Sequence, residues 1–597
     1  MPDALQTYQQ RLSDYSNQRL AINRRINVIS NLRLAAFVAM VAVAFSFYRQ
    51  NLYLYATAGF VIGIAVFVTF VIRNKTLVDR RDTLDKLISI NRNGISRLQN
   101  RWQDFQDTGS DFIDSQHPYT NDLDIFGPQS AFQWIGSAHS FYGRRTLAHL
   151  LSSHPDSIEP VRLRQEAVRE LATRIDWRQS CEAIALNPVL SREPKKVLQW
   201  AEEEAFVFKD RVLSKILLIL PVMSLLAAIT LILYYNTLAI ASLVYSVHLV
   251  LWTILNRRTA PVLESFEKNG GAFLPFSRLM ESMENQSFSA KALTKLHEQL
   301  GPRGKTSGPL KRLASIIAAI EVRHSPMGYF VANLIWLWDI QCVIRAERWK
   351  RAHGGALRRW LETGGEIEAL ASLSTIHFEH PSWAFPLIED ASPHVGGTDL
   401  GHPLLSDDTR VTNNFSLDRK ISVAIITGSN MSGKSTFLRT VGINLVLGYA
   451  GAPVCASRMS CSPIHVYTSM RIGDNLRNNV STFYAELLRI KKIVDAVKRK
   501  ENILFLLDEL FRGTNSQDRH DGAVAVVKAL KTDHTLGIIS THDLQLSELG
   551  QKDTSIYACH FKEYYVDQEI HFDYKLYPGP STTRNAMFLI RTMGIPV

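Results

Sequence analysis

The sequence predicts a multidomain protein of α and α/β class, with helical hairpins that span a membrane, a helical core, and a carboxyl-terminal domain built on a mostly parallel sheet. Three observations lead to this class. At 597 residues the chain is too long for a single hydrophobic core. Its apolar residues, 46% of the total, include two pairs of long uncharged stretches. Beyond residue 400, short β-rich stretches alternate with helical ones.

We expect the chain to divide into seven segments. In order, they are an amphipathic cytoplasmic helix (1–31), a first transmembrane hairpin (32–72), a helix and linker (73–121), the first part of a helical core (122–215), a second transmembrane hairpin (216–255), the second part of the core (256–390), and an α/β domain (391–597). The core is expected in two parts because the second hairpin interrupts it.

The first segment has the pattern of an amphipathic helix. Apolar side chains recur at intervals of three and four residues from Leu5 to Ile29, interrupted only at Arg19, which places them on one helix face. A similar stripe runs from Leu84 to Phe105, after the first pair of apolar stretches. We therefore expect the first hairpin to extend into the cytoplasm as two antiparallel helices in contact. A seam for a partner protein is the alternative.

Four apolar stretches without any Asp, Glu, Lys or Arg predict the two transmembrane hairpins. They are Leu34–Tyr48, Leu52–Ile72, Ile216–Tyr235 and Leu238–Leu255. Stretches of about 17–25 apolar residues match the thickness of the hydrocarbon layer of a bilayer. The first stretch is the shortest, and the arginines at its two ends can snorkel to the interface. Buried core helices are the alternative interpretation.

Basic residues flank these stretches unevenly, and this bias predicts the orientation. Only Arg49 lies at a hairpin tip, whereas the other flanks carry clusters of Lys and Arg. By the positive-inside rule, both termini and the α/β domain should lie in the cytoplasm, and the protein should be a multi-pass protein of the cell membrane. Part of the net charge of +11 therefore comes from the Lys and Arg residues that set the membrane orientation. Binding to anionic lipid explains these residues as well as binding to nucleic acid does. The five cysteines lack CxxC spacing, which fits a reducing compartment.

Helical patterning fills residues 122–215 and resumes from about 257 to 385. Two stretches interrupt the helical parts of the chain. Residues 106–120 lack periodicity and are predicted to be a linker, and residues 301–309 form a break rich in Gly, Pro and Lys.

Three apolar runs of strand length predict the sheet of the carboxyl-terminal domain. They are Ile421–Ile426, Ile503–Leu507 and Leu536–Ser540. Helical stretches separate them, as expected for a mostly parallel sheet covered by helices.

The stretch from Gly428 to Ser435 fits the phosphate-binding pattern GxxxxGK[ST] without a mismatch, between an apolar strand and a helix-forming run. The glycines allow backbone N–H groups to close around phosphate at a helix N-terminus. Lys434 should neutralise the β- and γ-phosphates of ATP, and Ser435 should bind Mg²⁺. The expected nucleotide-binding residues are Gly428, Ser429, Asn430, Met431, Ser432, Gly433, Lys434, Ser435 and Thr436.

Two further strand ends carry residues expected for hydrolysis. Asp508 and Glu509 follow the second strand; one carboxylate should hold the Mg²⁺ shell, and the next should polarise the attacking water. A solvated strand end is the alternative. His542 follows the third strand, where we expect it to contact the γ-phosphate. The predicted catalytic residues are thus Lys434, Glu509 and His542, with Ser435 and Asp508 as metal ligands.

In this order and spacing, the motifs resemble the P-loop, ABC-like ATPase domain of the MutS family. Upstream, residues 122–127, 143–147, 164–168 and 366–374 resemble parts of the family's helical core. The resemblance covers most of residues 122–200 and 366–597. Within the ATPase domain, the matching residues are Asn430-Met431, Arg471-Ile472-Gly473, Ser481-Thr482-Phe483, Asp508-Glu509, Arg512-Gly513-Thr514, Ser540-Thr541-His542 and Gly594-Ile595-Pro596.

The resemblance implies an ATPase that uses ATP and Mg²⁺ and forms a homodimer through its ATPase domains. It implies that Ser481 faces the γ-phosphate bound by the other subunit, although Ser481 also suits an ordinary helix N-cap. It places Arg410 where a phenylalanine usually stacks on adenine, and arginine can stack there too. Mismatch reading is not expected, because no Phe-x-Glu wedge precedes Asp122. We also expect the second hairpin to replace the family's DNA clamp.

Three classes of function stay open on the sequence. One is a membrane-anchored MutS-like ATPase, for which DNA binding without mismatch specificity is left open; the family implies DNA binding, but the Lys/Arg clusters are also typical of solvated helix faces. Another is an ABC-type transport or membrane-remodelling ATPase with no role in DNA binding. The third is a DNA-binding or tethering module in which ATP only regulates the strength of binding. Against transport, the chain has no LSGGQ-like segment, and His248 is the only His, Asp, Glu, Lys or Arg in the four apolar stretches. We expect no small-molecule transport substrate.

Overall fold

The computed structural model describes residues 3–155, 157–204, 206–208, 210–233, 238–267, 270–302, 304–471, 482–511, 515–566 and 569–581. The chain divides into two compact units. The sheet unit comprises residues 1–136, 150–165 and 373–597, and the helical unit comprises residues 137–149 and 166–372.

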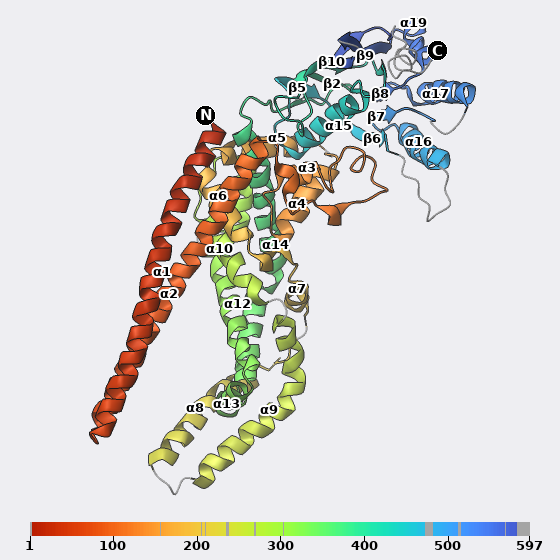
Figure 1. The fold of residues 1–597 in the computed structure, drawn as a ribbon. Coiled ribbons are helices and arrows are strands. Elements are labelled where there is room, and N and C mark those ends of the chain that lie inside the picture. Colours follow the sequence, from red (N-terminus) through yellow and green to blue (C-terminus); the bar gives the residue numbers. More distant parts are fainter. Residues whose placement is uncertain are drawn as a thin grey trace. The chain divides into compact units, whose positions relative to one another are not determined.

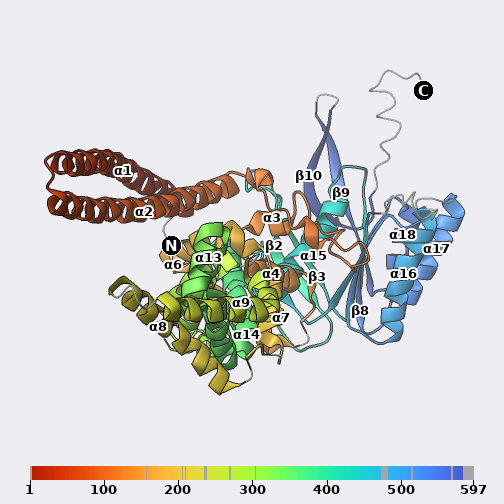
Figure 2. The same ribbon diagram turned by 90° about the horizontal axis from the view of Figure 1, so that it is seen from below.

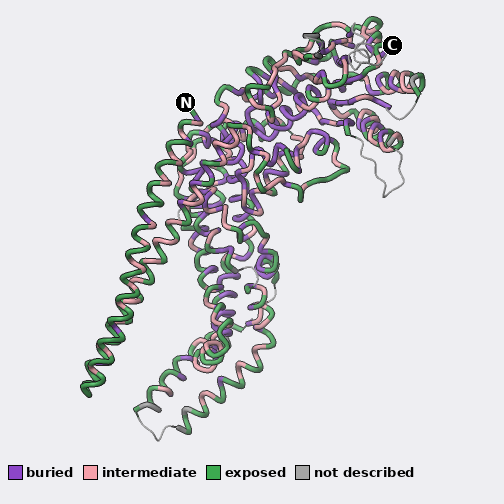
Figure 3. Tube along the Cα trace, in the orientation of Figure 1, coloured by how far each residue is buried: buried purple, intermediate pink, exposed green. Residues whose placement is uncertain are grey.

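The sheet unit begins with a hairpin of two long helices, α1 (Ala4–Arg49) and α2 (Tyr53–Leu98), which run side by side (Figures 1 and 2). In the turn between them, Asn51 adopts a left-handed conformation with φ 59°. Helix α1 joins the first predicted stripe to its apolar stretch without a break, whereas α2 ends at Leu98 and so carries the second stripe, predicted from Leu84 to Phe105, only in part. Both helices are long and apolar enough to cross a membrane, and only 6% of the most apolar window of each is buried (Figure 3).

A buried carboxylate attaches the base of this hairpin to the end of α14 (Trp338–Glu379). Glu379 accepts hydrogen bonds from Tyr8 Oη of α1 at 3.0 Å and from Arg97 Nε of α2 at 2.8 and 2.9 Å. The Arg97 and Glu379 side chains are 7% and 1% exposed, so their ion pair is shielded from water. One carboxylate therefore bonds to both helices of the hairpin.

The predicted linker at residues 106–120 is ordered, although it has no helical or strand periodicity. Its short 3₁₀ helix, η2 (Ser110–Phe112), packs Phe112 against Phe132 of α3 (Ala131–Ile135). Tyr119 is buried, and its hydroxyl donates to a backbone carbonyl oxygen at 3.2 Å. Single contacts of this kind leave no repeating pattern in a sequence. Another 3₁₀ helix, η1 (Trp102–Asp104), precedes this segment.

The carboxyl-terminal part of the sheet unit contains a six-stranded sheet in the order β10-β9-β4-β8-β7-β6. Neighbouring strands are parallel except β9 and β10. This arrangement confirms the mostly parallel sheet, with the three predicted apolar runs as β4, β7 and β8. The strands are β4 (Val423–Thr427), β6 (His465–Ser469), β7 (Ile503–Asp508), β8 (Thr535–Ser540), β9 (Ile556–Val566) and β10 (Glu569–Pro578).

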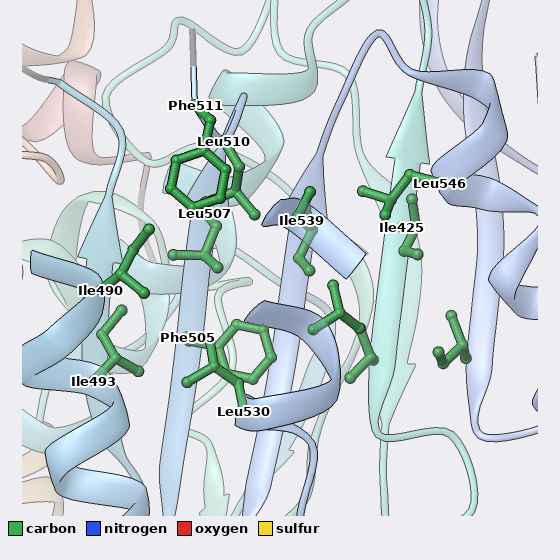
Figure 4. Close-up of a cluster of buried hydrophobic side chains, with 14 of the residues drawn as sticks. Ile425, Ile490, Ile493, Phe505, Leu507, Leu510, Phe511, Leu530, Ile539 and Leu546 are labelled. Carbon is green, nitrogen blue, oxygen red and sulfur yellow. The ribbon is translucent and has the colours of Figure 1, made fainter. Parts of the chain in front are cut away.

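Every residue of β4, β7 and β8 is buried, as expected for central parallel strands. Figure 4 shows part of this core, where Phe505 and Leu507 of β7 lie among side chains from neighbouring strands and helices. The register pairs Asp508 with Ser540, so β7 and β8 end side by side. The associated helices are α15 (Lys434–Ala450), α16 (Thr482–Lys498), α17 (Ser516–Leu530), α18 (Leu544–Ser547) and α19 (Leu549–Lys552).

A second, four-stranded sheet of the same unit was not predicted. Its order is β1-β5-β2-β3. Its strands are short and carry polar residues and glycine, which hides them from a search for apolar runs. They are β1 (Leu387–Ile388), β2 (Val395–Leu400), β3 (Asn413–Leu417) and β5 (Arg458–Cys461).

The helical unit confirms the helical patterning on both sides of the second hairpin. The predicted break at residues 301–309 covers the gap between α11 (Lys291–Leu300) and α12 (Ser307–Ile320), but its last three residues already form the first turn of α12. There the Glu284 carboxylate accepts from the backbone N–H of Ser307 at 3.0 Å. The other helices wholly or partly in this unit are α4 (Phe141–Ser152), α5 (Ile158–Ala172), α6 (Ile175–Ala185), η3 (Pro188–Ser191), α7 (Lys195–Glu202), η5 (Gly270–Ala272), α10 (Phe273–Glu284), η6 (Glu321–His324), α13 (Pro326–Trp336) and most of α14.

The second predicted hairpin is also helical, as α8 (Arg211–Leu233) and α9 (Leu238–Glu267) (Figure 1). Large apolar side chains such as Ile219, Leu226 and Val250 are exposed on both helices. Within the described ranges, α1 and α2 are the two helices that meet the length and composition needed to cross a membrane; the apolar part of α8, at 215–230, is shorter. Membrane crossing by the second hairpin therefore stays a prediction.

Candidate functional site

The predicted phosphate loop connects β4 to α15 with the backbone turns that its glycines permit. Gly428 and Gly433 adopt positive φ angles of 145° and 102°. A Cβ atom at Gly428 would lie 2.9 Å from Ser432 Oγ and 3.0 Å from the carbonyl oxygen of Phe561, so a larger residue does not fit there. The loop ends at the N-terminus of α15, where free backbone N–H groups attract an anion.

Two polar groups of this loop suit a phosphate ligand. Lys434 is 5% exposed, and its Nζ donates to the carbonyl oxygens of Gly428 and Ser429 at 2.9 and 2.7 Å. Ser432 is 1% exposed, and its hydroxyl has no hydrogen-bond partner among the described residues. A buried hydroxyl without a partner is costly, and a phosphate oxygen would satisfy it. The loop therefore fits the triphosphate of a nucleotide.

The two predicted metal ligands are in direct contact. Ser435 Oγ, in the first turn of α15, donates to Asp508 Oδ2 at 2.6 Å, and the other oxygen of Asp508 accepts from Ser540 Oγ at the end of β8. The parallel register of β7 and β8 brings these groups to one edge of the sheet. A hydroxyl and a carboxylate are oxygen ligands of the kind that Mg²⁺ prefers, so the pair fits a magnesium ion shared with a phosphate.

The predicted base and the predicted histidine also meet. His542 Nε2 lies 2.9 Å from Glu509 Oε1. Glu509 has a φ of 52°, in the left-handed region that residues other than glycine rarely adopt, and its N–H donates to the carbonyl oxygen of Ser540 at 3.0 Å. A strained backbone conformation persists only where the surrounding structure fixes it, and such conformations are often found at functional sites. The sequence placed both residues at the site but did not predict this contact, and the roles of Glu509 as base and of His542 at the γ-phosphate stay predictions.

Lys434, Ser435 and Glu509 border a cavity of about 570 Å³, within the range of about 300–1,000 Å³ typical of ligand sites, whereas Asp508 and His542 are not among its lining residues. Burial, with help from two nearby arginines, lowers the pKa of the lining residue His402 to about 4, so the imidazole is neutral at pH 7. A larger hollow of about 830 Å³, on the four-stranded sheet, contains none of the predicted site residues. The 570 Å³ cavity is lined by Asn430 to Thr440 in part, Glu509, Leu400, His402, Leu405, Thr409, Val411, Asn413, Phe561 and Tyr574.

Arg410 does not line this cavity, contrary to the expectation that it stacks on adenine. Its guanidinium lies 5.2 Å from the ring centre of Trp383, and its Nε donates to the carbonyl oxygen of His402 at 2.9 Å. Further bonds to Asp407 and to the carbonyl oxygen of Leu405 hold the side chain in place. Arg410 is thus engaged with protein groups, while its neighbours in sequence face the cavity.

Several lining residues were not predicted from the sequence. Tyr574 of β10 has a φ of 53°, and its ring reaches the phosphate loop, 3.1 Å from where a Cβ of Gly433 would lie. His402 lies between β2 and β3 of the four-stranded sheet, in a segment without a recognisable motif. Ser481 lies outside the described residues, as do the motif residues 472–473, 512–514 and 594–596. The role of Ser481 toward a second subunit therefore stays a prediction.

Comparison with known proteins finds similarity in the carboxyl-terminal part of the chain, which contains the phosphate loop. Residues 424–597 match the family model described as MutS domain V. The chain is 32% identical over 221 residues to the DNA mismatch repair protein MSH6 of Arabidopsis thaliana, which covers 35% of this chain and 16% of that protein. It is 30% identical over 344 residues to the DNA mismatch repair protein MutS of Streptococcus pyogenes serotype M49, covering 55% of this chain and 37% of that protein. The aligned regions thus span well under half of these relatives.

Proposed function

This chain belongs to the MutS family through its domain V, and on that premise we propose that it is a membrane-anchored ATPase that hydrolyses ATP at composite sites in a homodimer. One observation carries the proposal. The Ser435–Asp508 pair and the Glu509–His542 pair both adjoin the phosphate loop, and the cavity that this loop lines includes Ser435 and Glu509. Phosphate cradle, metal ligands and base are thereby assembled in one place.

In this function Lys434 exchanges the two carbonyl oxygens it now contacts for phosphate oxygens of ATP. The backbone N–H groups of the loop and the Ser432 hydroxyl complete the cradle. Ser435 and Asp508 would hold Mg²⁺, which would supply positive charge against the phosphates. Because Asp508 already accepts hydrogen bonds on both oxygens, it is oriented before the ion arrives.

Glu509 accepts a proton from the attacking water, whose oxygen forms the new bond to the γ-phosphorus as the bond to the ADP oxygen breaks. His542, in hydrogen-bond contact with the Glu509 carboxylate, fixes the orientation of that carboxylate. We assign Ser481 to the γ-phosphate site of the opposite subunit, as the family resemblance implies. Hydrolysis then requires a dimer.

The first hairpin serves as the membrane anchor in this proposal. Large apolar side chains of α1 and α2, such as Leu34, Phe45 and Val61, are exposed, and such a surface is stable in lipid but not in water. The basic flanks support an orientation with the ATPase domain on the cytoplasmic side of the cell membrane.

A chain of contacts within the sheet unit supports communication between the anchor and the nucleotide. Glu379 bonds to both anchor helices, and the next residue, His380, stacks on Trp383 with ring centres 4.3 Å apart. Trp383 in turn carries the Arg410 guanidinium, which bonds to the carbonyl of the cavity-lining residue His402. Movement of the cavity wall on ATP binding would therefore reach the base of the hairpin.

DNA binding is part of the proposal because the relatives named above are DNA mismatch repair proteins. The lack of mismatch specificity is proposed because no Phe-x-Glu tripeptide precedes Asp122. The experiment is ATP hydrolysis by the full-length protein in detergent, with Mg²⁺ or with a chelator, and with or without duplex DNA at two salt concentrations. Magnesium-dependent hydrolysis supports the ATPase. A salt-dependent stimulation, equal for matched and mismatched duplexes, supports the DNA role. An ATP hydrolysis rate that is the same with and without DNA favours a membrane-remodelling or transport ATPase instead.

A further inference from the structure

Helix α13 (Pro326–Trp336) of the helical unit has an apolar outer surface. Met327 is 82% exposed, and Phe330, Val331 and Trp336 are between 43% and 49% exposed. A cluster of large apolar side chains on the surface of a helix is unfavourable in water. The sequence predicted only helical patterning for this segment, so what covers the exposed apolar surface has to be inferred from the structure.

The buried face of the same helix is polar. Asn333 is fully buried; its amide donates to the carbonyl oxygen of Tyr329 at 3.1 Å, and its oxygen accepts from the N–H of Asp339 at 3.0 Å. Tyr329 Oη donates to the buried carboxylate of Asp339 at 2.8 Å. Helix α13 thus has polar groups inside and apolar groups outside, which is the arrangement expected where the surrounding medium is lipid.

Side chains of the second hairpin satisfy the carbonyl oxygens at the end of α13. His248 Nδ1 of α9 lies 2.9 Å from the carbonyl oxygen of Leu334, and Ser224 Oγ of α8 donates to the carbonyl oxygen of Ile335 at 2.5 Å. The last carbonyls of a helix lack partners in their own helix, and in water they bond to solvent. Here two fully buried side chains take that place, as is required where water is absent.

The same contacts locate the end of α13 along the hairpin. Ser224 and His248 each lie near the middle of a predicted apolar stretch, at 216–235 and 238–255. After Trp336 the chain turns through Leu337, with φ 48°, and α14 leaves at 74° to α13. With 11 residues, α13 is about 16 Å long, which is too short to cross a hydrocarbon layer of about 30 Å.

We propose that α13 is a third lipid-embedded element of the helical unit, lying in one leaflet against α8 and α9 with its apolar surface covered by acyl chains. This inference rests on the proposed membrane anchoring and on the membrane insertion of the second hairpin that the sequence predicts. The exposed apolar side chains of α13 continue the exposed apolar surfaces of α8 and α9. Trp252 of α9 packs on both Tyr329 and Phe330 of α13. His248 then serves as a cap for a broken helix inside the membrane.

The test places single cysteines on the full-length protein, labels them with bimane, and measures fluorescence in vesicles of ordinary or brominated phosphatidylcholine. All five native cysteines are buried, so labelling reports the introduced site. The test sites are Met327→Cys and Phe330→Cys. Leu226→Cys and Val250→Cys report the hairpin itself, and Lys291→Cys, on an exposed position of α11, is the aqueous control.

We expect brominated lipid to remove a similar share of the fluorescence at Met327, Phe330, Leu226 and Val250, and little at Lys291. Quenching at the hairpin sites without quenching on α13 would overturn the inference and leave the membrane proposal intact. Disulfide cross-linking of unquenched Phe330→Cys between two chains would then assign the surface to a second copy. Absence of quenching at all four sites would refute membrane insertion of the second hairpin and, with it, the inference.

Discussion

Replacing Glu379 by glutamine should strongly destabilise the base of the first hairpin. Glu379→Gln removes the charge that balances Arg97, whose side chain is 7% exposed and cannot turn easily to water. Breaking one partner of a buried ion pair typically costs about 3–5 kcal/mol. The two Arg97 hydrogen bonds of 2.8 and 2.9 Å and the Tyr8 bond of 3.0 Å place this site in that range.

An exposed ion pair in the same hairpin provides the control. Arg19 and Asp85 lie 2.5 Å apart across α1 and α2, with side chains 46% and 41% exposed. Pairs of this kind contribute about 0–1 kcal/mol, so Asp85→Asn should have little effect.

The assay is denaturant unfolding of the full-length protein in detergent, followed by circular dichroism. We expect Glu379→Gln to lower the unfolding midpoint far more than Asp85→Asn. The double variant Arg97→Met with Glu379→Gln should recover much of the loss, because it leaves no buried charge unpaired. If the single variant at Glu379 behaves like Asp85→Asn, or if the double variant is no better, the carboxylate does not hold the hairpin.

Three further predictions concern the nucleotide site. Lys434→Ala should abolish ATP binding, measured by equilibrium binding, because the phosphate cradle loses its charge; unchanged affinity would exclude the assigned loop. Mixing Ser481→Ala chains with Glu509→Gln chains should restore hydrolysis at one of two composite sites, and heterodimers as inactive as both parents would refute a role in trans. Because burial lowers the pKa of His402 to about 4, the unfolded chain takes up a proton that the folded chain resists. The free energy of unfolding should therefore fall by about 2 kcal/mol from pH 7 to pH 5 through this group. His402→Gln should show a correspondingly flatter pH dependence, and an identical slope would contradict the buried state.

The sequence predicted the central sheet well because of its burial. Central parallel strands are apolar on both faces, so β4, β7 and β8 are continuous apolar runs that end in polar site residues. The four-stranded sheet gave no such signal, since β2 contains Gly396 and Gly397 and β3 begins with two asparagines. Strand pairing there depends on partners far away in the sequence.

The sequence predicted which residues belong to the candidate site better than it predicted the contacts among them. The phosphate-loop pattern and the acidic strand end identified Ser435 and Asp508, and the parallel register then brought them within hydrogen-bond distance. Arg410 was misplaced because an aligned position does not reveal where a side chain points; the nearby ring of Trp383 and backbone carbonyls capture it. Tyr574 joins the cavity from a hairpin that no motif marks.

The long helices illustrate a different limit. Apolar stretches and stripes predicted α1 and α2, but the ion pair at Glu379 joins residues hundreds of positions apart. In α13, the periodicity of apolar residues gave a helix but not which face is buried. The hydrogen bonds of Asn333, Ser224 and His248 show which face of α13 is buried.

Hydrolysis assisted by Glu509 is tested most directly by single-turnover cleavage of ATP by Glu509→Gln in the full-length protein, beside wild type and the surface control Glu548→Gln. Because the phosphate loop and the Ser435–Asp508 pair stay intact, the variant should bind ATP as wild type does. Its hydrolysis rate should fall by about 10²- to 10⁴-fold, the usual contribution of a positioned general base, while Glu548→Gln keeps the wild-type rate. Cleavage by Glu509→Gln at the wild-type rate would contradict the assigned chemistry.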